Sequence, residues 1–150
     1  MFIVVGVTGG IAAYKSVHLV RLLIGAGHDV HVVPTEDALR FVGLPTWESI
    51  SRNPVTTSVH DDVPRVRHVA LGQQADLVVV APATANIIAK MAHGFADDML
   101  PTVILAAKCP KLVSPAMNTG MLENPITQDN IATLEKYGFT VIPSESGVLA

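Results

Sequence analysis

Short apolar runs rich in β-branched residues alternate along this chain with longer segments of helical periodicity, and this alternation restricts the possible folds most strongly. Phe2–Val5 is one such run and is closed by glycines. Residues 11–24 then carry a long apolar stripe that ends at Gly25-Ala26-Gly27, where a helix would stop. Val30–Val33 gives the next strand. The first 34 residues therefore predict a β-α-β unit.

The same alternation continues to the end of the chain. The expected strands are apolar at successive positions rather than at every second one, which is typical of a parallel sheet covered on both faces. Right-handed crossovers then give a doubly wound α/β fold with three layers, helix, sheet and helix. We expect further strands at 77–81, 111–114 and 140–142, and helices around 85–91, 99–107 and 125–137.

The segment from Pro45 to His68 is less regular, because Pro45, Pro54 and Pro64 punctuate a polar stretch. It contains His60-Asp61-Asp62, which could bind a metal but is more simply a solvated turn. We assign no secondary structure to this segment and expect no metal site.

Composition limits the size of the protein and the classes of function. With 150 residues, 49% of them hydrophobic, the chain suits a single domain over residues 1–150. The net charge of −3 gives no broad basic surface for nucleic acid or an anionic membrane. The apolar runs are far shorter than the roughly 18 residues of a membrane-spanning helix. The single cysteine, Cys109, cannot form an internal disulfide, and no signal peptide opens the chain, so we expect a cytoplasmic protein.

Four segments follow expected strands, and in open parallel sheets ligands bind beyond the carboxyl ends of the strands. In the first segment, Gly9 and Gly10 let the backbone approach a ligand, and Ile11 opens a helix whose N-terminus favours an anion. The spacing is not G-x-G-x-x-G, so a mononucleotide phosphate suits this turn better than a dinucleotide. A tight strand-to-helix turn without a ligand is the alternative.

The second and third segments each offer a hydroxyl. Thr35 could reach a phosphate, although capping of the next helix explains it about as well. Thr84 lies between Ala83 and Ala85, whose small side chains leave backbone N–H groups accessible to phosphate oxygens, and Asn86 adds an amide. Taken alone, Thr84 is most simply a helix cap.

The fourth segment is the Pro-, Gly- and Met-rich turn that holds Asn118. Its amide could orient a carboxylate or a flavin carbonyl, although an asparagine in a turn usually satisfies local backbone groups. Outside these segments, His68 follows the basic Arg65-Val66-Arg67. It could act as a base or bind a carboxylate, or it could equally be a surface histidine on a basic strand.

Several blocks together resemble the homo-oligomeric flavin-containing cysteine decarboxylases. The blocks are Thr8–Lys15, Pro82–Asn86, Gly94–Leu100 and Pro115–Asn118, in order along essentially the whole chain. The Pro-Ala-Met-Asn block followed by Met-x-x-x-Pro is the most specific. The likeness is nearest to the members that act on 4'-phosphopantothenoylcysteine. It implies a Rossmann-like (flavodoxin-like) fold, non-covalent FMN, and active sites at the subunit contacts of a homotrimer or dodecamer. Bacterial members are often fused to a ligase domain that joins cysteine to phosphopantothenate.

The resemblance also implies roles for individual residues. Catalysis is implied for His68, and contact with the substrate carboxylate for Asn118. The implied FMN contacts are Gly9, Gly10, Ile11, Thr35, Ala83, Thr84, Ala85, Asn86, Ala116 and Met117. In the implied reaction of coenzyme A biosynthesis, FMN oxidises the Cβ–S unit of the cysteine to a thioaldehyde, which serves as the electron sink for loss of CO₂. Reduced flavin then returns the electrons, giving 4'-phosphopantetheine.

Two alternatives stay open. One is a relative that decarboxylates a peptidyl C-terminal cysteine or prenylates flavin, and the other is a non-catalytic, flavin-binding regulatory subunit. The chain also departs from the family twice: Ile87 stands where relatives often carry a hydroxyl, and the chain stops at Ala150, one residue before the expected flap cysteine. We therefore expect either a truncation before the substrate flap or an impaired final reduction.

Overall fold

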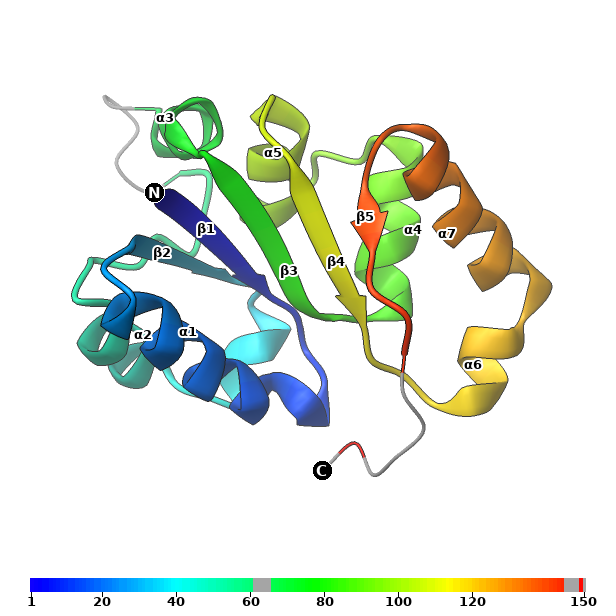
Figure 1. Ribbon diagram of the computed structural model, residues 1–150, viewed down its shortest axis with the longest axis horizontal. Helices are drawn as coiled ribbons and strands as arrows, with labels where there is room; N and C mark the ends of the chain where they lie inside the picture. The colour runs from blue at the N-terminus through cyan, green and yellow to red at the C-terminus, as the bar shows by residue number, and fades with distance from the viewer. Residues whose placement is uncertain (61–65, 145–148, 150) are drawn as a thin grey trace.

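The core of the protein is a five-stranded sheet in which all strands are parallel (Figure 1). The computed structural model describes residues 1–60, 66–144 and 149. The strand order is β2-β1-β3-β4-β5, so the winding reverses between β1 and β3, and the doubly wound, flavodoxin-like fold is confirmed. The strands are β1 (Phe2–Val7), β2 (Asp29–Pro34), β3 (Leu77–Ala83), β4 (Lys111–Pro115) and β5 (Thr140–Val141).

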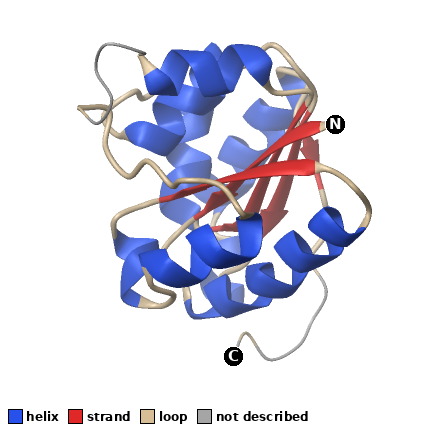
Figure 2. Cartoon of the chain, turned by 90° about the vertical axis from the view of Figure 1, so that its left-hand side faces the viewer, coloured by secondary structure: helices blue, strands red, loops and turns tan. Residues whose placement is uncertain are grey.

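Helices cover both faces of this sheet, as Figure 2 shows. The helices are α1 (Lys15–Gly25), α2 (Leu44–Ser51), α3 (Arg67–Gln74), α4 (Ala85–His93), α5 (Met99–Ala106), α6 (Thr119–Glu123) and α7 (Pro125–Lys136), with 3-10 turns η1 (Ile11–Tyr14) and η2 (Asp37–Arg40). Side chains alternate across β1: Val5 packs with Val20 of α1 and Trp47 of α2, whereas Val4 packs in the cluster that holds Leu100 of α5. The strands are therefore buried on both faces, as their continuous apolar runs predict.

The irregular segment from Pro45 to His68 contains helical structure that the sequence interpretation missed. Helix α2 starts at Leu44 with Pro45 in its first turn, where the missing N–H of proline has no partner to lose. Helix α3 starts at Arg67, so His68 lies on a helix and not on the basic strand considered as the alternative. Pro45 was therefore a signal for the start of a helix and not an interruption of regular structure.

Three features named in the sequence lie partly or wholly outside the described residues. Asp61 and Asp62 of the expected turn and Arg65 of the basic cluster belong to 61–65, and the end of the chain before the expected flap falls on 145–148 and 150. Among the described residues, no helix is long and apolar enough to cross a membrane.

Gly72 of α3 packs directly against α5. A Cβ there would lie 2.8 Å from the Val103 carbonyl oxygen and 2.9 Å from the Ala106 Cβ. Because one of these atoms is backbone, Gly72→Ala should push the helices apart and lower the free energy of unfolding by about 1–3 kcal/mol. Thermal denaturation measures this loss. Gly25→Ala is the control, since a Cβ there meets nothing within 4 Å, and a Gly72→Ala protein that melts with the control would contradict this packing.

Candidate functional site

A pocket of about 540 Å³ lies at the carboxyl edge of the sheet, where the winding reverses. Gly9 follows β1, Thr35 follows β2, and Thr84 and Asn86 follow β3, and all four line the pocket. The structure thus brings three of the four predicted segments together. This position, beyond the carboxyl ends of β1 and β3, is the usual ligand site of such a sheet.

Thr8 forms the link between the two strands that meet at the pocket. Its buried hydroxyl donates to the Pro82 carbonyl oxygen at 2.6 Å and accepts from the Thr84 backbone N–H at 3.1 Å. The same side chain lines the pocket. Sequence reasoning placed Thr8 in the glycine-rich turn and in the first block of the resemblance but assigned it no role, although its place directly after a strand was the available signal.

Gly9 is the residue at which the pocket has no room for a side chain. A Cβ there would overlap the carboxylate of Asp37 and would lie 2.6 Å from the Asp37 Cβ. At the neighbouring Gly10, a Cβ would meet only the Thr84 Cγ2, at 3.7 Å. The Asp37 side chain therefore packs directly on the Gly9 backbone, which a residue with a Cβ would not allow.

The two predicted hydroxyls cap helical turns and also line the pocket. Thr35 Oγ1 accepts from the Ala38 N–H at 3.2 Å, and Thr84 Oγ1 accepts from the Ile87 N–H at 3.3 Å. Each capping bond uses an oxygen lone pair, so the hydroxyl proton can still be donated to a ligand. The capping and binding interpretations are therefore compatible.

The other predicted cofactor residues do not line this pocket. Ala83 is fully buried, and its carbonyl oxygen accepts from the Ala116 N–H at 3.0 Å, which joins the ends of β3 and β4. Met117 is half-buried against the core, and Ile11 is 50% exposed. Gly10 and Ala85 border lining residues in the sequence.

Charged side chains of the pocket were not foreseen. Glu36, Asp37, Arg40, Lys90 and Asp98 all belong to the lining. Arg40 Nη1 lies 3.6 Å from Asp37 Oδ1, so this cation already has a carboxylate partner. The sequence did hold signals for three of the acids: Glu36 and Asp37 follow Thr35 at an expected helix start, and Asp98 precedes an apolar helix. The Asp98 Oδ1 accepts from the Met99 N–H at 2.8 Å.

Lys90 is also paired. Its Nζ lies 2.9 Å from Asp97 Oδ2, and the hydrogen bond from Lys90 holds the pKa of Asp97 below its ordinary value. An anion in the pocket would therefore depend on backbone N–H groups, hydroxyls and the N-terminus of α4 rather than on unpaired cations.

His68 and Asn118 lie far apart in one chain. Helix α3, which carries His68, sits beside the amino ends of the strands, and α6, which Asn118 caps, lies beyond the carboxyl end of β4 (Figure 1). Asn118 is exposed, and its Oδ1 accepts from the Gly120 N–H at 2.8 Å, the local capping considered above. Neither residue lines the pocket.

His68 itself is half-buried, and its Nδ1 is enclosed without a hydrogen-bond partner among the described residues. A buried ring nitrogen without a partner is costly in a structural histidine. This nitrogen is buried within the chain itself, so a ligand can reach it only after a local rearrangement. Elsewhere in the described parts of the chain, no cluster of three or more His, Cys, Asp or Glu side chains could hold a metal.

Asp29 has a perturbed carboxyl group near the amino edge of the sheet. Partial burial acts to raise its pKa, but the hydrogen bond from Asn53 and the proximity of His31 outweigh this, so the pKa lies below its ordinary value. A carboxylate with a lowered folded-state pKa stabilises the fold above its unfolded pKa, and this stabilisation is lost as the pH falls through the folded value. We expect Asp29→Asn to lower Tm at pH 7 and the difference from the wild type to shrink below about pH 4. A Tm difference that stays constant down to pH 2 would contradict the assignment.

Comparison with known proteins identifies the family. The sequence profile described as Flavoprotein matches residues 1–150. The chain belongs to the Flavoprotein family. Over 147 residues it is 57% identical to the coenzyme A biosynthesis bifunctional protein CoaBC of Mycolicibacterium smegmatis, covering 98% of this chain and 36% of the relative. Over 152 residues it is 47% identical to a probable phosphopantothenoylcysteine decarboxylase of Streptococcus mutans, covering 99% of this chain and 85% of the relative.

Solved structures agree with this placement. The FMN-dependent cysteine decarboxylase SpaF superposes with a TM-score of 0.88 at 35% identity, over 95% of this chain and 83% of that one. A PPC decarboxylase mutant complexed with pantothenoylaminoethenethiol superposes with a TM-score of 0.82 at 30% identity, over 95% of this chain and 81% of that one. The resemblance stated from the sequence is thus confirmed, and the Flavoprotein chain spans about a third of the bifunctional relatives and most of the single-function ones.

Proposed function

We propose that this chain is an FMN-dependent decarboxylase that converts 4'-phosphopantothenoylcysteine to 4'-phosphopantetheine, either alone or as the decarboxylase part of a larger bifunctional protein. The observation that carries the proposal is the pocket at the reversal of winding, built by Gly9, Thr35 and Thr84 in a chain of the Flavoprotein family. The names of the Mycolicibacterium and Streptococcus relatives support the substrate.

The residues of the pocket fit a flavin mononucleotide phosphate. Gly9 contributes backbone to the lining, Thr35 and Thr84 can donate hydroxyl protons, and α4 directs its N-terminus at the pocket beside Asn86. Ile87 lines the pocket where relatives often have a hydroxyl, so the phosphate depends more on backbone N–H groups there. When bound, FMN supplies the reversible oxidation that makes the cysteine carboxylate a leaving group.

In this proposal the protein orients the substrate and controls its protons. The Asn118 side-chain amide donates to the substrate carboxylate and holds it for loss of CO₂. His68 takes the proton of the substrate thiol through its imidazole ring. Since α3 and α6 lie at opposite edges of the sheet in one chain, a site that uses both residues takes them from two subunits. This supports a homo-oligomer with active sites at subunit contacts.

Mixing two inactive variants tests the shared site. His68→Asn and Asn118→Ala are each expected to be inactive, but co-refolded oligomers should regain activity at contacts that combine one intact His68 with one intact Asn118. The readout is CO₂ release per bound flavin, and wild type co-refolded with either variant is the control for subunit exchange. Verified mixed oligomers without recovered activity would show that one subunit supplies both residues.

Uptake of flavin tests the cofactor separately. Titration of the purified protein with FMN should give a protein-bound yellow chromophore, and riboflavin should bind more weakly because it lacks the phosphate. Equal affinity for both flavins would contradict a phosphate site at Gly9 and α4. A protein that binds FMN but releases CO₂ only from a peptide with a C-terminal cysteine would favour the peptide-directed alternative.

A further inference from the structure

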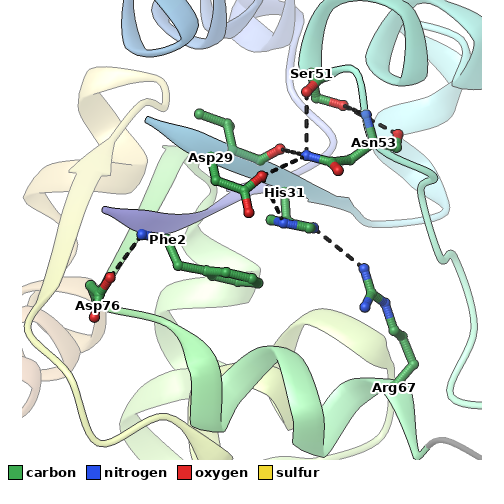
Figure 3. A network of polar contacts seen from close by, with 8 residues as sticks. Phe2, Asp29, His31, Ser51, Asn53, Arg67 and Asp76 are labelled. Atoms are coloured by element: carbon green, nitrogen blue, oxygen red, sulfur yellow. Dashed lines mark hydrogen bonds and ion pairs between the residues drawn. The ribbon is translucent and has the colours of Figure 1, made fainter. Parts of the chain in front are cut away.

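A chain of polar contacts at the amino edge of the sheet ends at the helix that carries His68 (Figure 3). Asn53 Nδ2 donates to Asp29 Oδ1 at 3.0 Å and to the Val30 carbonyl oxygen at 2.8 Å. His31 Nε2 lies 3.1 Å from the same Asp29 oxygen, and Arg67 Nη2 donates to His31 Nδ1 at 3.3 Å. None of these residues lines the flavin pocket.

His31 is unusual for its position. It is 8% exposed in the middle of β2, where the following Val32 and Val33 are buried aliphatic residues. Its ring stacks on Phe2, with centroids 4.2 Å apart and planes 9° from parallel. A buried imidazole costs desolvation unless its nitrogens have partners, and a phenyl ring would serve packing better. We therefore expect the ring nitrogens of His31 to serve in polar contacts and not only in packing.

The arrangement assigns the two ring nitrogens different functions. Because Arg67 can only donate, His31 Nδ1 must be the acceptor, which places the ring proton on Nε2, toward Asp29. The Nε2 contact has an ion-pair distance but lacks hydrogen-bond alignment, so the bond with Arg67 is the better-formed of the two.

The start of α3 needs such an anchor. Val66, the residue before the helix, has φ +48°, a left-handed conformation that a β-branched side chain rarely adopts. No side chain caps the helix there, and the Val69 and Ala70 N–H groups donate to the Val66 carbonyl oxygen at 3.0 and 3.1 Å. Strain at Val66 favours fraying of this turn, and the Arg67 bond to His31 opposes it.

We propose that His31 is a positioning residue for the decarboxylation: through Arg67 it fixes the first turn of α3 and so the place of His68. The inference rests on the proposed function only in treating His68 as the proton-handling group. Asp29, itself held by Asn53, faces the Nε2 atom of His31, and Phe2 supports the ring from β1.

Two substitutions distinguish the contribution of the stacked His31 ring from that of its acceptor atom Nδ1. His31→Phe keeps the stacking on Phe2 but removes the acceptor, and His31→Asn places an amide oxygen near Nδ1 but removes the ring. In His31→Phe, we expect hydrogen exchange of the Val69 and Ala70 amides to quicken about tenfold as the turn frays. The kcat should fall about tenfold because a small misplacement of a reacting group is costly, while KM and FMN affinity change little. His31→Asn should recover most of both losses, and His28→Phe is the matched control.

Each outcome decides the inference. Unchanged exchange in His31→Phe overturns the anchor, and faster exchange with normal kcat overturns the link to His68. If His68→Asn is itself fully active, the failure lies with the proposed function. Should His31→Phe not fold, Arg67→Met removes the other end of the same bond and should show the same exchange and kcat. The variant that combines His31→Phe with Arg67→Met should then lose no more kcat than either single variant. Additive losses of kcat would contradict a bond shared by the two residues.

Discussion

Replacement of His68 by asparagine is expected to leave FMN bound and to lower kcat for CO₂ release by at least about 100-fold, in the range of a lost general acid–base group. FMN should stay bound because His68 is distant from the flavin pocket of its own chain: α3 lies beside the amino ends of the strands, whereas the pocket lies at their carboxyl ends. Flavin content per subunit and CO₂ release per bound flavin measure the two effects independently.

The control for this variant is His18→Asn, which makes the same change at an exposed position of α1. It should retain both flavin and turnover. Loss of flavin from His68→Asn together with intact turnover per bound FMN would move His68 from the chemistry to cofactor retention.

The second large effect is expected at Gly9. Gly9→Ala places a Cβ against the Asp37 side chain at the point where the backbone should meet the flavin phosphate. An overpacking cost of about 1–3 kcal/mol corresponds to roughly 5- to 150-fold weaker FMN binding if it falls on the bound state. Flavin fluorescence titration gives the Kd, and circular dichroism verifies the fold.

Two further variants test the cause of this loss. Gly10→Ala adds the same methyl group one residue later, where it meets only the Thr84 Cγ2, and should weaken FMN binding less. Asp37→Ala combined with Gly9→Ala removes the overlapping carboxylate and should recover much of the affinity. If Gly9→Ala binds FMN like the wild type, the phosphate does not rest on this turn.

The layout of the sheet could be predicted because each strand is buried on both faces. Val4 and Val5 face opposite layers of helices, so the pattern of β1 is apolar at successive positions. Helix α3 could not be predicted in the same way. A strained Val66 precedes its first turn, which has no side-chain cap, and the turn is held by the bond that Arg67 donates to His31, 36 positions away in the sequence.

The residues of the candidate site likewise fall into those that a local pattern predicts and those that depend on the packing of the whole fold. Gly9, Thr35 and Thr84 could be predicted because each follows a strand, and parallel strands end at one edge of the sheet. Lys90 reaches the pocket from the second turn of α4, and its position depends on how that helix packs rather than on a local pattern. The separation of His68 from Asn118 is likewise a property of the whole fold.

Product analysis by mass spectrometry tests the central claim most directly. The purified protein is loaded with FMN and incubated with 4'-phosphopantothenoylcysteine, with the His68→Asn protein as the parallel control. We predict a product lighter than the substrate by one CO₂, formed by the wild-type protein and not by the control. Flavin-loaded protein that leaves the substrate mass unchanged would contradict the account.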